Sequence, residues 1–274
     1  MLYKFNFAAP KTVPELLSIL NDHRDDGKFL AGGTDLIPNI RSGLIKPNWV
    51  IDGKKIPEAS AISFSGSDGL KIGLAVTIND VLRNKDAREK YPALCECAHE
   101  LASHQVRNRA TVAGNVVNAS PCSDMAPALL CLNASALLRS SGGERVVSFR
   151  EFFTGVKKTV IKPGEYLESI TIPAASGGAQ GAYLKLKRIA GHDLGVVGVM
   201  MVRLNDSILF AISSAAPVPV LVDTVTRQDS PDEAAAKVLA KVSPITDVRG
   251  GKDYREHMIG VYVRRLLREK GAGL

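Results

Sequence analysis

Residues 28–36 have the sequence KFLAGGTDL, a short apolar run that ends in two glycines. Lys28 to Ala31 is predicted to be a buried strand, and the apolar spacing that resumes at Leu36 is typical of a helix. Adjacent glycines at a strand end leave consecutive backbone N–H groups free to point outward, and the positive end of a following helix reinforces them. Residues 31–35 are therefore a candidate cradle for phosphate oxygens.

The simpler alternative for residues 31–35 is a tight turn, which two glycines after a strand form more often. The stretch also lacks the Gly-Lys-Ser/Thr of a Walker A loop and the third glycine of a Rossmann fingerprint. Taken alone, the diglycine does not identify a ligand.

A second unusual stretch, TVAGNVVNASPCSD, spans residues 111–124. Its mixture of small, β-branched and polar residues predicts neither an ordinary helix nor an ordinary strand over 112–121, and it suits close approach of the backbone to a ligand. Its polar side chains could hydrogen-bond phosphate, ribose or the edge of a flavin, although a purely structural loop is the alternative. Two such stretches, about eighty residues apart, fit a large dinucleotide held between two domains.

The rest of the chain predicts a mixture of helices and strands. Thr12, with Glu15 three residues later, predicts the start of a helix over 12–23, and a strand over 49–51 completes a β-α-β type unit. After Lys162-Pro163-Gly164 the pattern becomes rich in strands, which predicts a domain boundary. The other predicted elements are a strand over 69–76, a helix from Thr77, a helix over 92–103, a hairpin of 134–139 and 145–147, strands over 166–172, 182–188, 195–204 and 208–213, and helices over 230–242 and 254–268.

Composition argues against several classes of function. The net charge of +7 arises from basic residues interspersed with acids and without stacking aromatics, so nucleic-acid binding is not expected. The four cysteines lack paired C-x-x-C elements and the five histidines are scattered, so we expect reduced, buried thiols and no metal site. No apolar run approaches the ~20 residues that span a bilayer, and the N-terminus lacks a secretory signal pattern, so a cytoplasmic protein is expected.

Residues 28–36 and 111–129 resemble the two FAD-binding motifs of the medium subunits of xanthine dehydrogenases and carbon monoxide dehydrogenases, which belong to the molybdenum hydroxylase family. The likeness continues through 185–188, 192–194, 244–249 and 254–255, so it covers nearly the whole chain. One departure is Ala113, where many relatives have a second glycine before Gly114. This departure concerns only the local contact at Ala113.

The resemblance implies an α+β fold. Residues 1–164 would form an FAD-binding domain of the vanillyl-alcohol-oxidase or PCMH type, with subdomains of about 1–55 and 56–164. Residues 165–274 would form a C-terminal α+β domain like that of the carbon monoxide dehydrogenase flavoprotein.

The resemblance also implies the cofactor site. Ala31 to Asp35 would wrap the pyrophosphate of FAD, and Lys185 would reach the cofactor from the C-terminal domain. His192 is either a residue near the isoalloxazine ring or an exposed loop residue, and no catalytic side chain is expected because the flavin carries the redox chemistry. The full expected set of cofactor-binding residues is Lys28, Leu30, Ala31, Gly32, Gly33, Thr34, Asp35, Leu36, Thr111, Val112, Ala113, Gly114, Asn115, Asn118, Ser120, Asp124 and Lys185.

By the same resemblance, the chain is the electron-transfer subunit of a heteromeric molybdenum hydroxylase. A large subunit with the molybdopterin cofactor would oxidise the substrate, a small subunit would carry [2Fe-2S] clusters, and two such heterotrimers would pair. FAD on this chain would pass the electrons to an external acceptor. The alternatives are a free-standing flavin-dependent reductase or oxidase and a flavin-free assembly protein. The sequence names neither the substrate nor the acceptor.

Overall fold

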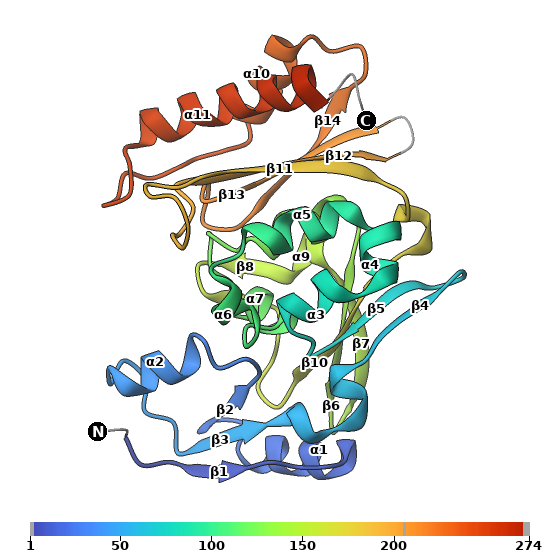
Figure 1. The fold of residues 1–274 in the computed structure, drawn as a ribbon. Coiled ribbons are helices and arrows are strands. Elements are labelled where there is room, and N and C mark those ends of the chain that lie inside the picture. Colours follow the sequence, from blue (N-terminus) through green and yellow to red (C-terminus); the bar gives the residue numbers. More distant parts are fainter. Residues whose placement is uncertain (1–2, 205–206, 271–274) are drawn as a thin grey trace.

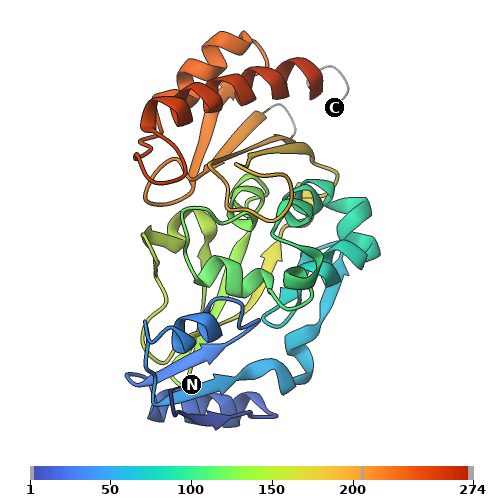
Figure 2. The same ribbon diagram turned by 60° about the vertical axis from the view of Figure 1, so that its left-hand side comes forward.

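The computed structural model describes residues 3–204 and 207–270, which form three layers stacked along the long axis of the molecule (Figure 1). A small N-terminal sheet lies at one end, a larger sheet with many short helices lies in the middle, and a third sheet backed by two helices lies at the other end. The same order is visible after a turn of 60° (Figure 2). The mixed α+β architecture agrees with the fold class expected from the sequence.

The N-terminal layer is a three-stranded parallel sheet with helices beside it. Its elements are β1 (Asn6–Ala8), α1 (Val13–Asp22), β2 (Gly27–Leu30), α2 (Leu36–Arg41) and β3 (Trp49–Asp52), followed by the 3-10 turns η1 (Gly53–Lys55) and η2 (Pro57–Ser60). The strand order is β1-β3-β2, and both pairings are parallel. The hydroxyl of Thr12 accepts a hydrogen bond from the Glu15 N–H at 3.3 Å, which confirms the predicted start of α1.

The middle layer contains a five-stranded antiparallel sheet. Its strands, in chain order, are β4 (Ile62–Ser65), β5 (Gly69–Gly73), β6 (Ser135–Ser140), β7 (Gly143–Ser148) and β10 (Tyr166–Ile172). The smaller elements are α3 (Ile78–Arg83), α4 (Lys85–Lys90), α5 (Pro92–Glu100), α6 (His104–Arg107), α7 (Val112–Val117), α8 (Met125–Cys131), α9 (Phe149–Phe152), β8 (Phe153–Gly155), β9 (Lys158–Thr159) and η3 (Ala174–Ser176). The spatial order is β4-β5-β10-β6-β7, so β10 is the central strand.

Strand β10 affects where the chain is divided into domains. The predicted boundary at residue 164 would assign β10 to the C-terminal domain, but β10 pairs with β5 on one side and β6 on the other. We therefore propose a boundary after Ile172. The boundary at residue 164 and the boundary after Ile172 both stay predictions.

Helix α7 corrects the expectation that residues 112–121 form no ordinary element. The side chain of Thr111 caps this helix, and Val112 and Val116 are fully buried. A short helix of β-branched and small residues is stable here because packing in the core outweighs its weak intrinsic propensity.

The C-terminal layer is a four-stranded antiparallel sheet, packed on both faces. Its elements are β11 (Gln180–Leu186), β12 (Val197–Leu204), β13 (Ser207–Ser213), β14 (Val220–Thr226), α10 (Pro231–Leu239), α11 (Lys252–Arg265) and the π-helical end η4 (Leu266–Lys270). Helices α10 and α11 cover the outer face, and α5 and α8 of the middle layer pack against the inner face (Figure 1). Since β12 and β13 are covered on both faces, nearly all their residues are buried, as the continuous apolar runs in the sequence suggest.

The four cysteines are free thiols. Cys97 and Cys131 are buried, whereas Cys95 and Cys122 are only partly buried. Burial raises the pKa of the Cys95 thiol to about 11. No helix among the described residues is both long and apolar enough to cross a membrane.

Helix α11 is held to the sheet by a buried arginine. Arg255 is 1% exposed, and its Nη1 donates to the carbonyl oxygens of Val196 at 2.7 Å and Ser214 at 3.1 Å. Its Nη2 donates to Oδ1 of Asp247 at 2.6 Å. A buried guanidinium requires such partners, so this set of bonds fixes the position of the helix.

Asp247 connects this arginine to the middle layer. Its Oδ2 accepts a bond from Nη2 of Arg249 at 2.6 Å, and Nη1 of Arg249 contacts Sγ of Cys122 at 2.6 Å. Cys122 lies in the loop that follows α7. The C-terminal layer is therefore tied directly to the second of the two unusual sequence stretches.

Asp247 should make the stability of the chain decrease at acidic pH. The Arg249 guanidinium beside it, helped by Arg255, holds the pKa of the Asp247 carboxyl well below its usual 3.8. Stability gained this way is fully present above the unfolded-state pKa and is lost as the pH falls through the folded-state pKa. We expect Asp247→Asn to lower the free energy of unfolding by about 2 kcal/mol at pH 7, with the difference from wild type shrinking below about pH 4. Urea unfolding at a series of pH values measures this, and a difference that stays constant into acid would contradict it.

Candidate cofactor-binding site

The first sequence stretch forms a turn at the end of β2. Strand β2 runs parallel to β3, with Leu30 opposite Asp52, and the chain then turns through residues 31–35 into α2. Gly33 has a φ of +77°, a conformation that residues with a side chain rarely adopt. This conformation suits a sharp turn between β2 and α2.

Gly32 packs the first stretch against the two residues that come just before the second. A Cβ atom on Gly32 would lie 2.2 Å from the carbonyl oxygen of Arg109 and 2.9 Å from Cα of Ala110. Such distances are far below van der Waals contact, so only glycine allows the two backbones to pack this closely. The need for glycine at position 32 therefore has a structural cause, in addition to any role in ligand binding.

The second stretch begins against the same turn. The hydroxyl of Thr111 accepts a hydrogen bond from the Gly114 N–H at 2.9 Å and so caps α7. A Cβ on Gly114 would lie 2.8 Å from this hydroxyl, 3.5 Å from Cβ of Ala31 and 3.9 Å from the backbone nitrogen of Gly32. The two motifs, far apart in the sequence, are thus adjacent in space.

The turn presents a set of free donors. None of the hydrogen bonds formed among residues 3–204 and 207–270 uses the backbone N–H groups of Gly32, Gly33 or Thr34. Three consecutive unused amides in a glycine turn are the donor set that phosphate oxygens need. These residues therefore fit the pyrophosphate of a dinucleotide such as FAD.

The polar side chains of the second stretch are largely used inside the protein. Oδ1 of Asn115 accepts bonds from the Ser123 hydroxyl at 2.6 Å and from the Met125 N–H at 3.3 Å. Oδ1 of Asn118 accepts a bond from Nζ of Lys157 at 2.9 Å, and the Ser120 hydroxyl accepts one from the Cys122 N–H at 3.3 Å. These contacts hold the loop between α7 and α8 in shape. The Asn115 amide nitrogen has no partner among the residues that the structure describes, so it can donate to a ligand.

Asp124 and Lys185 form a buried ion pair between the middle and C-terminal layers. Nζ of Lys185 lies 2.8 Å from Oδ2 of Asp124, and the two side chains are 2% and 10% exposed. The Tyr183 hydroxyl donates to Oδ1 of Asp124 at 3.0 Å, and Lys185 also donates to the carbonyl oxygen of Glu100 at 3.1 Å. Within the described part of the chain, two of the three ammonium hydrogens of Lys185 are therefore engaged with protein, which leaves one for a ligand.

Burial controls the titration of this cluster. It raises the pKa of Asp124 despite the opposing effect of Lys185, and it raises the pKa of Tyr183 well above its usual value. The tyrosine is therefore a neutral donor at neutral pH.

The remaining expected residues differ in accessibility. Lys28, Thr34, Asp35 and His192 are exposed, and Leu30 and Leu36 are partly buried. Val112 and Ala113 are 0% and 4% exposed and belong to the core. The methyl group of Ala113, the residue that departs from the family pattern, therefore packs inside the protein. A contact between these two residues and a cofactor would have to use the backbone.

One residue near the turn, Lys54, could not be predicted from the sequence to lie there. Nζ of Lys54, in η1, donates to the carbonyl oxygen of Ala31 at 3.0 Å. Lysine in a polar loop is usually solvated, and only the pairing of β2 with β3 brings position 54 to the end of β2, next to Ala31.

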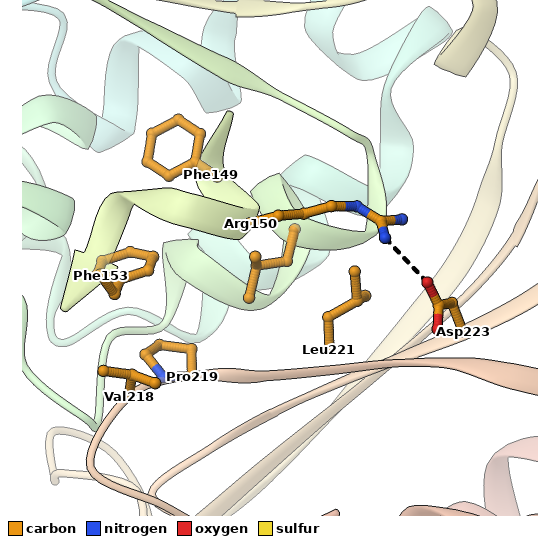
Figure 3. Close-up of a pocket in the computed structure, with 8 residues that line it drawn as sticks. Phe149, Arg150, Phe153, Val218, Pro219, Leu221 and Asp223 are labelled. Carbon is orange, nitrogen blue, oxygen red and sulfur yellow. Dashed lines mark hydrogen bonds and ion pairs between the residues drawn. The ribbon is translucent and has the colours of Figure 1, made fainter. Parts of the chain in front are cut away.

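A cavity of about 240 Å³ lies elsewhere, between α9 and β14 with the loop that precedes β14 (Figure 3). Phe149, Phe153, Val218, Pro219 and Leu221 line it, and the ion pair between Arg150 and Asp223, at 2.9 Å, lies beside it. None of the expected cofactor-binding residues lines this cavity.

Comparison with protein families places most of the chain in one of them. Residues 3–175 match the family described as the FAD binding domain in molybdopterin dehydrogenase. The carbon monoxide dehydrogenase medium chain of Hydrogenophaga pseudoflava is 31% identical, over 96% of both chains. The xanthine dehydrogenase FAD-binding subunit of Escherichia coli O157:H7 is 27% identical, over 97% of this chain and 96% of the relative.

The fold agrees with these relationships. The structure of carbon monoxide dehydrogenase from Hydrogenophaga pseudoflava that lacks the Mo-pyranopterin moiety contains a chain similar to this one, with a TM-score of 0.90 and 30% identity. The match covers 98% of this chain and 97% of that chain.

Proposed function

Because the chain belongs to the family of FAD-binding medium subunits of molybdenum-containing dehydrogenases, we propose that it binds FAD and passes electrons from the [2Fe-2S] clusters of a partner to an external acceptor. Substrate oxidation takes place at the molybdopterin cofactor of a large partner subunit. The two relatives are named for different substrates, carbon monoxide and xanthine.

The observation that carries FAD binding is the set of free N–H groups at Gly32, Gly33 and Thr34, directly against the second motif. These amides bind the pyrophosphate. Bound FAD supplies the redox chemistry, and the protein supplies its position and electrostatic surroundings.

The other expected residues have supporting roles in this proposal. The Asn115 amide nitrogen and the remaining hydrogen of Lys185 are donors to the cofactor. Thr111 and Asp124 act through the protein, because Thr111 caps α7 and Asp124 holds Lys185 in place. His192 stays a prediction, since its exposed loop position fits both a residue near the ring and a solvated side chain.

The working form is a pair of heterotrimers, each with a large subunit, a small iron–sulfur subunit and this chain. Membership of the family supports the presence of partner subunits. The pairing of two heterotrimers stays a prediction, as does a cytoplasmic location.

Purification of the chain with a tag tests the proposal, in cells that also express the neighbouring coding sequences. We expect yellow protein with stoichiometric FAD, and large and small subunits that copurify and contain molybdenum and iron. Yellow protein that oxidises NAD(P)H alone would instead show a free-standing reductase. A colourless chain that still folds would point to an assembly protein and would refute FAD binding.

A further inference from the structure

Lys54 lies beside the glycine turn and belongs to neither of the two motifs. It belongs to η1, which directly follows β3, and its Nζ is 2.7 Å from Oδ1 of Asp52 and 3.0 Å from the carbonyl oxygen of Ala31. The Lys54 side chain is 26% exposed and that of Asp52 is 13% exposed. This is a partly buried, charge-assisted contact to the backbone of the first motif.

The position of Lys54 is fixed by the structure around it. The Asp52 carboxylate also accepts a bond from the Lys54 N–H at 3.0 Å, which caps the short turn η1. A Cβ on Gly53 would lie 2.6 Å from Cζ of Phe29, so η1 lies tightly on β2. The ring of Phe29 is in turn stacked on Tyr166 in the middle sheet, with centroids 5.7 Å apart.

The contact with Ala31 also determines where the next amide points. In a trans peptide, the C=O of one residue and the N–H of the following residue point in opposite directions. No cis peptide bond occurs among the described residues. When Lys54 holds the Ala31 carbonyl oxygen, the Gly32 N–H must therefore point away from Lys54.

We propose that Lys54 is a positioning residue for cofactor binding: its ammonium group fixes the Ala31 carbonyl and thereby directs the Gly32 N–H toward the pyrophosphate of FAD. This inference rests on the proposed function, because it takes FAD as the ligand of the turn. The paired Asp52 largely offsets the charge of Lys54, so the effect on binding comes mainly from the orientation of the peptide.

The chain offers a matched control in the next residue. Lys55 carries the same charge but is exposed, and it forms no ion pair or side-chain hydrogen bond with any residue in 3–204 or 207–270. Flavin-free full-length chains are titrated with FAD, and binding is followed by quenching of flavin fluorescence. We expect Lys54→Met to raise the Kd for FAD about tenfold and Lys55→Met to change it less than about twofold. Lys54→Arg, which keeps a charged donor, should stay within about threefold of wild type.

A double variant separates orientation from charge. Lys54→Met leaves the Asp52 carboxylate unpaired near the phosphates, and adding Asp52→Asn removes that charge. We expect the double variant to bind FAD as weakly as Lys54→Met. The melting temperatures of the flavin-free variants are measured in parallel and should match that of Lys55→Met.

Three results would overturn the inference. They are a Kd for Lys54→Met equal to that of Lys55→Met, a recovery of wild-type affinity in the double variant, and a Lys54→Arg chain that folds but binds as weakly as Lys54→Met. If the wild-type chain itself does not bind FAD, the proposed function fails instead, so the two failures are distinguishable.

Discussion

Gly32→Ala is expected to leave the purified chain without FAD, with an affinity at least about 100-fold below that of wild type. The added methyl group would lie 2.2 Å from the carbonyl oxygen of Arg109, so the first motif must move away from the segment that leads into the second. A shift of about 1 Å in a binding site is enough for a loss of this size. The overlap should also lower the free energy of unfolding by about 1–3 kcal/mol. Flavin absorbance per chain and urea unfolding measure the two effects.

Gly66→Ala is the control for this variant. No atom lies within 4 Å of a Cβ at position 66, so the same chemical change should leave both FAD content and stability near those of wild type. A Gly32→Ala chain with a full complement of FAD would show that the close packing of the two motifs is not needed for binding.

Asp124→Asn is expected to lower the free energy of unfolding by about 3–5 kcal/mol, since it leaves the buried Lys185 ammonium without a counter-charge. Denaturant unfolding measures the loss. The more accessible pair of Lys187 and Glu100 provides the control, with side chains 22% and 33% exposed. Glu100→Gln should cost no more than about 1 kcal/mol.

The double variant Asp124→Asn/Lys185→Met should regain part of the lost stability, because the unpaired charge is removed. If Asp124→Asn costs no more than Glu100→Gln, then the ion pair does not hold the two layers together. A normal melting temperature combined with lost FAD would assign Asp124 to cofactor binding alone.

Local sequence signals predict much of the fold. Thr12 with Glu15 and Thr77 with Asp80 predict the starts of α1 and α3, and both caps are present in the structure. The helix predicted over 92–103 ends at Glu100 instead, because Ala102 has a φ of +45° and Ser103 caps the separate helix α6. Strands β1 and β14 escape prediction because β1 has only three residues and β14 has the exposed pair Asp223 and Thr224 at its centre.

Less of the candidate site than of the fold could be predicted from the sequence. The glycine turn and its donors follow from Gly32 and Gly33, since the effect of glycine on the backbone is local. The internal partners of the polar residues could not be predicted in this way, because they are distant in the sequence. Tyr183 is 59 residues from Asp124, and Lys54 is 23 residues from Ala31. Side chains suited to a ligand are equally suited to another part of the chain, and only the tertiary structure decides between them.

The central place of β10 has a consequence for the order of folding. Strand β5 is synthesised almost a hundred residues before its partner, and β6 also lacks one neighbour until Tyr166–Ile172 has emerged. Contacts between residues so distant along the chain form slowly, and unpaired strand edges are prone to join other chains. The middle sheet, and with it the support under the second motif, can therefore be completed only late in synthesis. A nascent chain that stops before residue 166 exposes two unpaired edges where the finished protein has one continuous sheet.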